Sequence, residues 1–116
     1  MNRRNIGSLY EEIAVNYLKD NNYTIIEQNF RCKAGEIDII AFKDGILRFV
    51  EVKYRKDTKY GYAVSAVTDH KKHRLEKAAM WYLNIHSEFQ EMQCSFDVIA
   101  IQGDNVEYIF NSFSSF

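Results

Sequence analysis

The chain has 116 residues, 47% of them apolar, and it contains no proline. This length and apolar content suit one compact core, so we expect a single domain over residues 1–116 rather than two. No apolar run approaches the roughly 18 to 20 residues that a membrane-spanning helix needs, and the polar start from Met1 to Asn5 does not resemble a signal peptide. We therefore expect a cytoplasmic protein.

The net charge of −1 excludes a polycation, but the basic residues are unevenly distributed. They gather in residues 48–59 and again in residues 70–77. Phosphate binding depends on local rather than total charge, so such patches are compatible with a nucleic-acid surface. A solvated helix and loop surface would look the same, and charge alone leaves both interpretations open.

The first elements in chain order are a helix and a strand. Residues 8–20 carry apolar side chains at helical spacing, and Gly7 or Ser8 is placed to start the helix. After a short polar break, residues 23–31 are rich in aromatic and β-branched side chains, which predicts a strand.

Two further strands are predicted over residues 36–42 and 46–54. The Asp44-Gly45 pair between them is a strong hairpin signal, so the two strands should be antiparallel neighbours.

The second half of the chain begins with a helix predicted to start near Thr68 or Asp69 and to reach Leu83. Its aromatic residues, Tyr82 and Trp81, are expected in the core. Residues 95–102 and 105–110 then look like strands joined by Gly103-Asp104. This order of helix, three strands, helix and one or two strands predicts an α/β fold with a mixed sheet flanked by helices.

Charged side chains interrupt two of the apolar strands at every second position. Glu36 and Asp38 lie in one strand, and Glu51 and Lys53 lie in the next. Residues i and i+2 of a strand share a face, so each pair should project from one side of the sheet. If the strands form the predicted hairpin, the two pairs can converge at one end.

Two carboxylates on rigid strands suit Mg²⁺ or Mn²⁺, which prefers oxygen ligands and also takes water and a phosphate oxygen. Lys53 could then orient or deprotonate the attacking water, or stabilise charge on the phosphorane. The alternative is a solvated sheet face with ordinary cross-strand salt bridges, and the residues alone leave both interpretations open.

A family resemblance adds to this pattern. The strings from Asn29 to Ala41 and from Phe49 to Arg55 resemble the UPF0102 (YraN-like) family of bacterial proteins. That family is similar to the restriction-endonuclease-like PD-(D/E)xK fold, with archaeal Holliday-junction resolvases among its relatives, and the resemblance implies an αβββαβ core. Further matching segments are Val67 to Lys71, Arg74-Leu75, Ala78-Ala79, Tyr82-Leu83 and Phe96 to Ile101.

The resemblance implies a magnesium- or manganese-dependent DNA endonuclease in which Asp38 and Glu51 bind the metal and Lys53 is the catalytic lysine. Such resolvases also use a glutamate in the first helix. This implies Glu11 as a further catalytic and metal-binding residue, with Glu12 as the alternative. The competing interpretation is a solvated carboxylate on the helix face, or an acidic residue of the first turn that the helix dipole favours.

DNA contacts are expected from four basic residues. Lysines and histidines at residues 70–73 oppose the dipole of the second helix, which favours a bound anion there. Lys71 and Arg74 share a helix face and match family positions. Arg31 and Arg55, in the two matching strings, complete the expected nucleic-acid contacts.

The resolvase resemblance implies action on branched or otherwise structured DNA by a two-fold homodimer. So short a chain should contact the backbone and shape of DNA rather than base edges. The alternative function is a non-catalytic nucleic-acid-binding protein that keeps the nuclease fold. The complete set of Asp38, Glu51 and Lys53 favours the enzyme.

Overall fold

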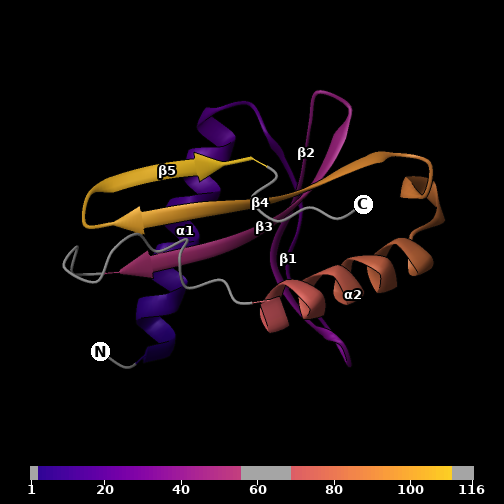
Figure 1. Ribbon diagram of the computed structural model, residues 1–116. Helices are drawn as coiled ribbons and strands as arrows, with labels where there is room; N and C mark the ends of the chain where they lie inside the picture. Colours follow the sequence, from indigo (N-terminus) through magenta and orange to yellow (C-terminus); the bar gives the residue numbers. More distant parts are fainter. Residues whose placement is uncertain (1–2, 56–68, 111–116) are drawn as a thin grey trace.

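The computed structural model describes residues 3–55 and 69–110, and the elements follow the predicted αβββαβ order (Figure 1). The largest difference in a boundary is at the first helix, which begins at Arg3 and not near Ser8. It runs through Gly7, which a helix interior tolerates at a cost of about 1 kcal/mol. The elements are α1 (Arg3–Asp20), β1 (Thr24–Cys32), β2 (Gly35–Lys43), β3 (Ile46–Arg55), α2 (Asp69–Ile85), the 3-10 helix η3 (Ser87–Phe89), β4 (Gln93–Gln102) and β5 (Asn105–Ile109).

The strands form one five-stranded sheet in the order β1-β2-β3-β4-β5. β3 and β4 are parallel, since α2 lies between them in the chain, and the other neighbouring pairs are antiparallel. The mixed sheet predicted from the sequence is therefore confirmed. Within the described ranges, none of the helices combines the length and apolarity needed to cross a membrane.

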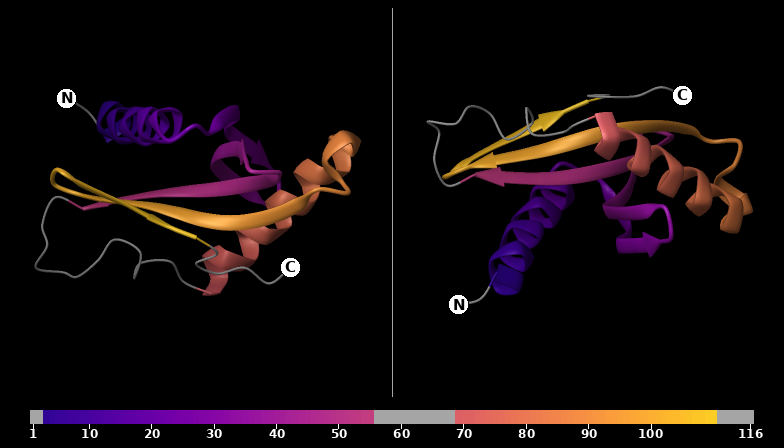
Figure 2. Two further views of the ribbon diagram at one scale, coloured as in Figure 1. Left: turned by 90° about the horizontal axis from the view of Figure 1, so that it is seen from above. Right: turned by 60° about the horizontal axis from the view of Figure 1, so that its bottom comes forward.

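The two helices cover opposite faces of the sheet (Figure 2). On one face, Leu75 and Tyr82 of α2 are buried in a core with Phe49. On the other face, Leu18 of α1 is buried in a second core with Val50. Phe49 and Val50 are neighbours in β3, so the alternation of this central strand supplies both cores.

The expectation that Trp81 lies in the core is wrong. Tyr82 is 1% exposed, whereas Trp81 is 47% exposed. Successive residues of a helix are turned by about 100° from each other, so a residue next to a buried position can face solvent.

The hairpin between β2 and β3 forms as the Asp-Gly pair predicts. Asp44 and Gly45 both have positive φ, 55° and 78°, and the flanking Lys43 and Ile46 are paired. Such a two-residue turn fixes the register of the two strands and therefore the relative positions of the charged residues that they carry.

Candidate functional site

The site lies where β2 and β3 separate. Their pairing runs from the hairpin as far as Ile39 and Val50. Asp38 is the next residue of β2 in the direction away from the hairpin, and its Oδ2 accepts a hydrogen bond of 2.8 Å from the backbone N–H of Val52. The carboxylate thus satisfies an N–H of β3 beyond the last backbone pair, and it is held at the fork between the strands.

Asp38 and Glu51 project from the same face of the sheet. Asp38 lies two residues before Ile40, and Glu51 lies two residues after Phe49; Ile40 and Phe49 belong to the core beneath α2. A cavity of about 330 Å³ separates the strands from the start of α2 at this point. Its walls are formed by Glu36, Asp38, Glu51, His70, Lys71, Arg74 and Leu75.

Glu51 is 6% exposed and is held by two lysines. Its Oε1 lies 3.5 Å from Nζ of Lys53, on the same strand, and 2.8 Å from Nζ of Lys71, on α2. The sequence predicted Lys71 as a phosphate contact but carried no signal for its pairing with Glu51. The ion pair depends on how α2 packs on the sheet, which a local pattern does not encode.

The charges of the site shift each other's protonation. Burial raises the pKa of Asp38 to about 7, and repulsion from the Glu51 carboxylate adds to this effect, with a smaller contribution from Glu11. Burial lowers the pKa of Lys53, and the neighbouring Lys71 lowers it further. A carboxyl group with a raised pKa in a cavity, close to a lysine with a lowered pKa, is typical of functional sites.

A second cavity of about 310 Å³ reaches Asp38 from the side of α1. Glu11 of α1 lines it, and burial raises the pKa of this glutamate. Glu12 is exposed and lines a separate groove that does not include Asp38. The second cavity is formed by Gly7, Ser8, Glu11, Asn29, Arg31, Glu36, Asp38, Val52 and Tyr54.

A model of the uncharacterised protein family UPF0102 matches residues 10–101. The chain belongs to this family. UPF0102 proteins of Lachnoclostridium phytofermentans, Pelobacter propionicus and Fusobacterium nucleatum are 37%, 44% and 40% identical to it. These alignments cover 100%, 95% and 96% of this chain and 98%, 83% and 92% of the relatives. The family resemblance inferred from the sequence motifs is thus confirmed.

The donor set of this UPF0102 protein fits a magnesium ion whose remaining ligands are water or phosphate oxygens. Among the described residues, no three Asp, Glu, His or Cys side chains lie close enough together to hold a metal ion. Mg²⁺ is, however, usually bound by one or two carboxylates together with water and phosphate oxygens. Asp38 and Glu51 supply two such carboxylates to one cavity, and a divalent cation would offset their repulsion. Glu11 as a further ligand stays a prediction.

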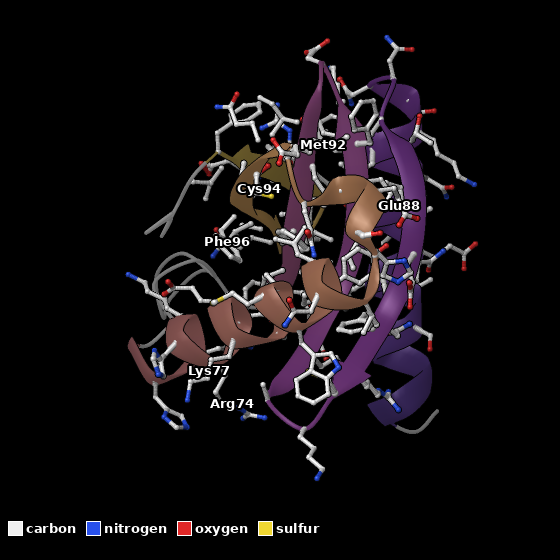
Figure 3. The ribbon with its side chains drawn as sticks, turned by 90° about the vertical axis from the view of Figure 1, so that its right-hand side faces the viewer. Arg74, Lys77, Glu88, Met92, Cys94 and Phe96 are labelled. Atoms are coloured by element: carbon white, nitrogen blue, oxygen red, sulfur yellow. The ribbon has the colours of Figure 1, made fainter. Side chains whose placement is uncertain are left out.

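The predicted DNA-binding residues have different local roles. Arg31 lines the second cavity and forms an exposed ion pair of 3.5 Å with Glu36. Arg74 projects from α2 (Figure 3), lines the first cavity, and donates a hydrogen bond of 3.3 Å from Nε to the carbonyl oxygen of Ala34. Arg55 ends β3, and its side chain lies outside the described part of the structure.

One further feature of the site could not be predicted from the sequence. Tyr10 stacks on Tyr54, with ring centroids 4.1 Å apart and an angle of 9° between the planes. Tyr54 nevertheless remains 40% exposed and lines the second cavity. The two rings come from α1 and β3, and no local sequence pattern indicates such a pair.

Proposed function

We propose that this UPF0102 protein is a metal-dependent DNA endonuclease that hydrolyses phosphodiester bonds. The observation that carries the proposal is the shared cavity of Asp38 and Glu51, with Lys53 at 3.5 Å from Glu51. Two hard carboxylates and a partly buried lysine on rigid strands are the groups that metal-assisted phosphodiester hydrolysis needs. The family resemblance implies the same roles in a PD-(D/E)xK site, with Asp38 and Glu51 as metal ligands and Lys53 as the catalytic lysine.

A bound Mg²⁺ or Mn²⁺ would supply a Lewis acid for the phosphoryl oxygen and lower the pKa of a water molecule. Asp38 would be one ligand of this ion, and the hydrogen bond from the N–H of Val52 orients its carboxylate. Glu51 is kept in place by Lys53 and Lys71. Because burial lowers the pKa of Lys53, a larger fraction of its amine is neutral than in an exposed lysine, and the neutral amine can accept a proton from the attacking water.

The substrate proposed is DNA bound through its backbone. Lys71 and Arg74 line the first cavity and Arg31 lines the second, so positive charge surrounds the carboxylates on two sides. Contacts of this kind position a phosphate backbone but carry no base sequence. We expect branched or structured DNA to be preferred over a particular sequence, and a two-fold homodimer in the cytoplasm to be the active form.

The competing function is a non-catalytic nucleic-acid-binding protein with the same fold. Pure protein should be incubated in Mg²⁺ or Mn²⁺ with linear duplex, single-stranded, flapped and four-way DNA. Wild type should cleave at least one of these, and Asp38→Asn and Glu51→Gln should not. Glu12→Gln is the matched control, because Glu12 is exposed and does not line the cavity of Asp38.

Equal cleavage by wild type and both site variants would indicate a contaminating nuclease. Salt-sensitive DNA binding without cleavage of any structure in either metal would support the binding protein instead. Circular dichroism of each variant separates loss of chemistry from loss of fold.

A further inference from the structure

We infer that the exposed ring of Tyr54 is a stacking surface for one unpaired nucleobase beside the reacting phosphate. The inference rests on the proposed function and names the class of substrate that the site takes: nucleic acid with an unstacked nucleotide next to the cleavage point. It is carried by the position of the second cavity and by the tyrosine pair at its edge.

The two cavities share Asp38 and Glu36. The first lies between the strands and α2, and the second lies toward α1, and these helices are on opposite faces of the sheet (Figure 2). They therefore meet where β2 leaves β3. A phosphate at Asp38 and Glu51 in the first cavity would place the adjoining nucleotide at the mouth of the second.

Tyr54 is built as a rigid platform at that place. Tyr10 packs parallel to it and fixes the plane of its ring. Tyr54 keeps 40% exposure although its strand is covered by a helix. A base could extend this two-ring stack, and such stacking tolerates any base because every base has a π face.

Polar groups around the platform suit the rest of a nucleotide. Arg31 lines the same cavity and offers a guanidinium for phosphate, and Asn29 offers an amide. A base inside an intact duplex is stacked between its neighbours and cannot reach Tyr54. The platform therefore selects single strands, flaps or junctions, in which a base is already unstacked or is extruded at a small cost.

The test uses wild-type protein without divalent metal and a short oligothymidine that carries one 2-aminopurine, whose fluorescence falls when it stacks on an aromatic ring. Binding to wild type should quench the probe. Tyr54→Leu should weaken binding about five-fold or more and abolish the quenching, whereas Tyr54→Phe should keep both. Trp81→Leu is the matched control, since Trp81 has similar exposure, 47%, but lines neither cavity.

A second measurement does not depend on how the variant folds. Abasic sites are placed one at a time along the oligonucleotide, and wild-type binding is measured for each. An abasic site at one position should weaken the binding of wild-type protein about five-fold or more. Equal affinity for every abasic oligonucleotide, or full quenching by Tyr54→Leu, would overturn the inference that Tyr54 is a stacking surface.

These outcomes are separable from the proposed function. Binding to single-stranded and duplex DNA without quenching would remove the stacking surface and leave the nuclease proposal standing. Absence of binding to any DNA would overturn both.

Discussion

β3 carries two buried charged residues that face opposite sides of the sheet, and their surroundings differ. Arg48 is 7% exposed and Glu51 is 6% exposed. Arg48 faces a closed cluster: its Nη1 lies 3.5 Å from Oδ2 of Asp97, and the hydroxyls of Ser95 and Tyr108 also donate hydrogen bonds to that carboxylate. Glu51 instead faces a cavity that it shares with a second carboxylate.

The comparison shows that burial alone does not mark a functional site. In the closed cluster, one carboxylate is offset by a cation and by hydroxyl donors, an arrangement that stabilises a fold once it is formed. In the open site, which contains Asp38 and Glu51, burial raises the pKa of Asp38 to about 7, and repulsion from Glu51 adds to this effect. The pKa of Asp38 stays raised although Lys53 and Lys71 pair with Glu51, so a repulsion remains that an incoming cation can relieve.

The largest effect on stability is expected in the closed cluster. Arg48→Met should lower the free energy of unfolding by about 3 kcal/mol or more, because Asp97 would lose its cation while fully buried. Arg31→Met is the matched control: it also removes an arginine from an ion pair, but that pair is exposed and should be worth below about 1 kcal/mol. Urea denaturation measures both. Similar losses in the two variants would contradict the distinction.

Removing the charge of Asp38 from the open site should raise the free energy of unfolding, whereas removing Arg48 from the closed cluster should lower it. The folded-state pKa of Asp38 is raised, so its ionised form opposes folding; this penalty is fully present above pH 7 and disappears as the pH falls toward the unfolded value. Without divalent metal, Asp38→Asn should therefore be more stable than wild type at pH 8, by on the order of 2 kcal/mol. The Asn side chain still accepts the hydrogen bond from Val52.

Thermal unfolding at pH 8 and pH 5 tests this prediction. The advantage of Asp38→Asn should shrink at the lower pH. A variant that is less stable than wild type at pH 8 would show that the carboxylate stabilises the fold, as the charges of the closed cluster do.

The sequence predicted the parts of the open site that follow local rules. The Asp44-Gly45 turn set the hairpin, and the period of two placed Asp38 and Glu51 on one face. The ion pair of Lys71 with Glu51 and the closed cluster around Asp97 were not predicted. Both depend on contacts between distant segments, one across the packing of α2 and the other across parallel strands, which have no turn to fix their register.

The basic residues around the open site should act on DNA affinity. Lys71→Gln combined with Arg74→Gln should weaken binding to all sequences and reduce the salt dependence by about 0.9 per lost phosphate contact. Lys77→Gln is the control, because Lys77 is exposed on α2 and does not line the first cavity. Fluorescence anisotropy at several salt concentrations measures both quantities, and an unchanged slope in the double variant would remove α2 from the binding face.

The smallest effect is expected on the side of α1. Glu11→Gln should slow cleavage about ten-fold, since Glu11 lines the second cavity with Asp38 and acts on its charge. Glu12→Gln should leave the rate unchanged. Single-turnover rates on the best DNA substrate make the comparison, and equal rates for the two variants would confine the chemistry to the strands.

Metal binding tests the central claim most directly, namely that the repulsion between Asp38 and Glu51 is relieved by a divalent cation. Isothermal titration calorimetry with Mn²⁺ at pH 8 should give saturable binding to wild type and to Glu12→Gln, and none to Asp38→Asn. Equal Mn²⁺ binding by wild type and Asp38→Asn, or no binding by either, would contradict the account.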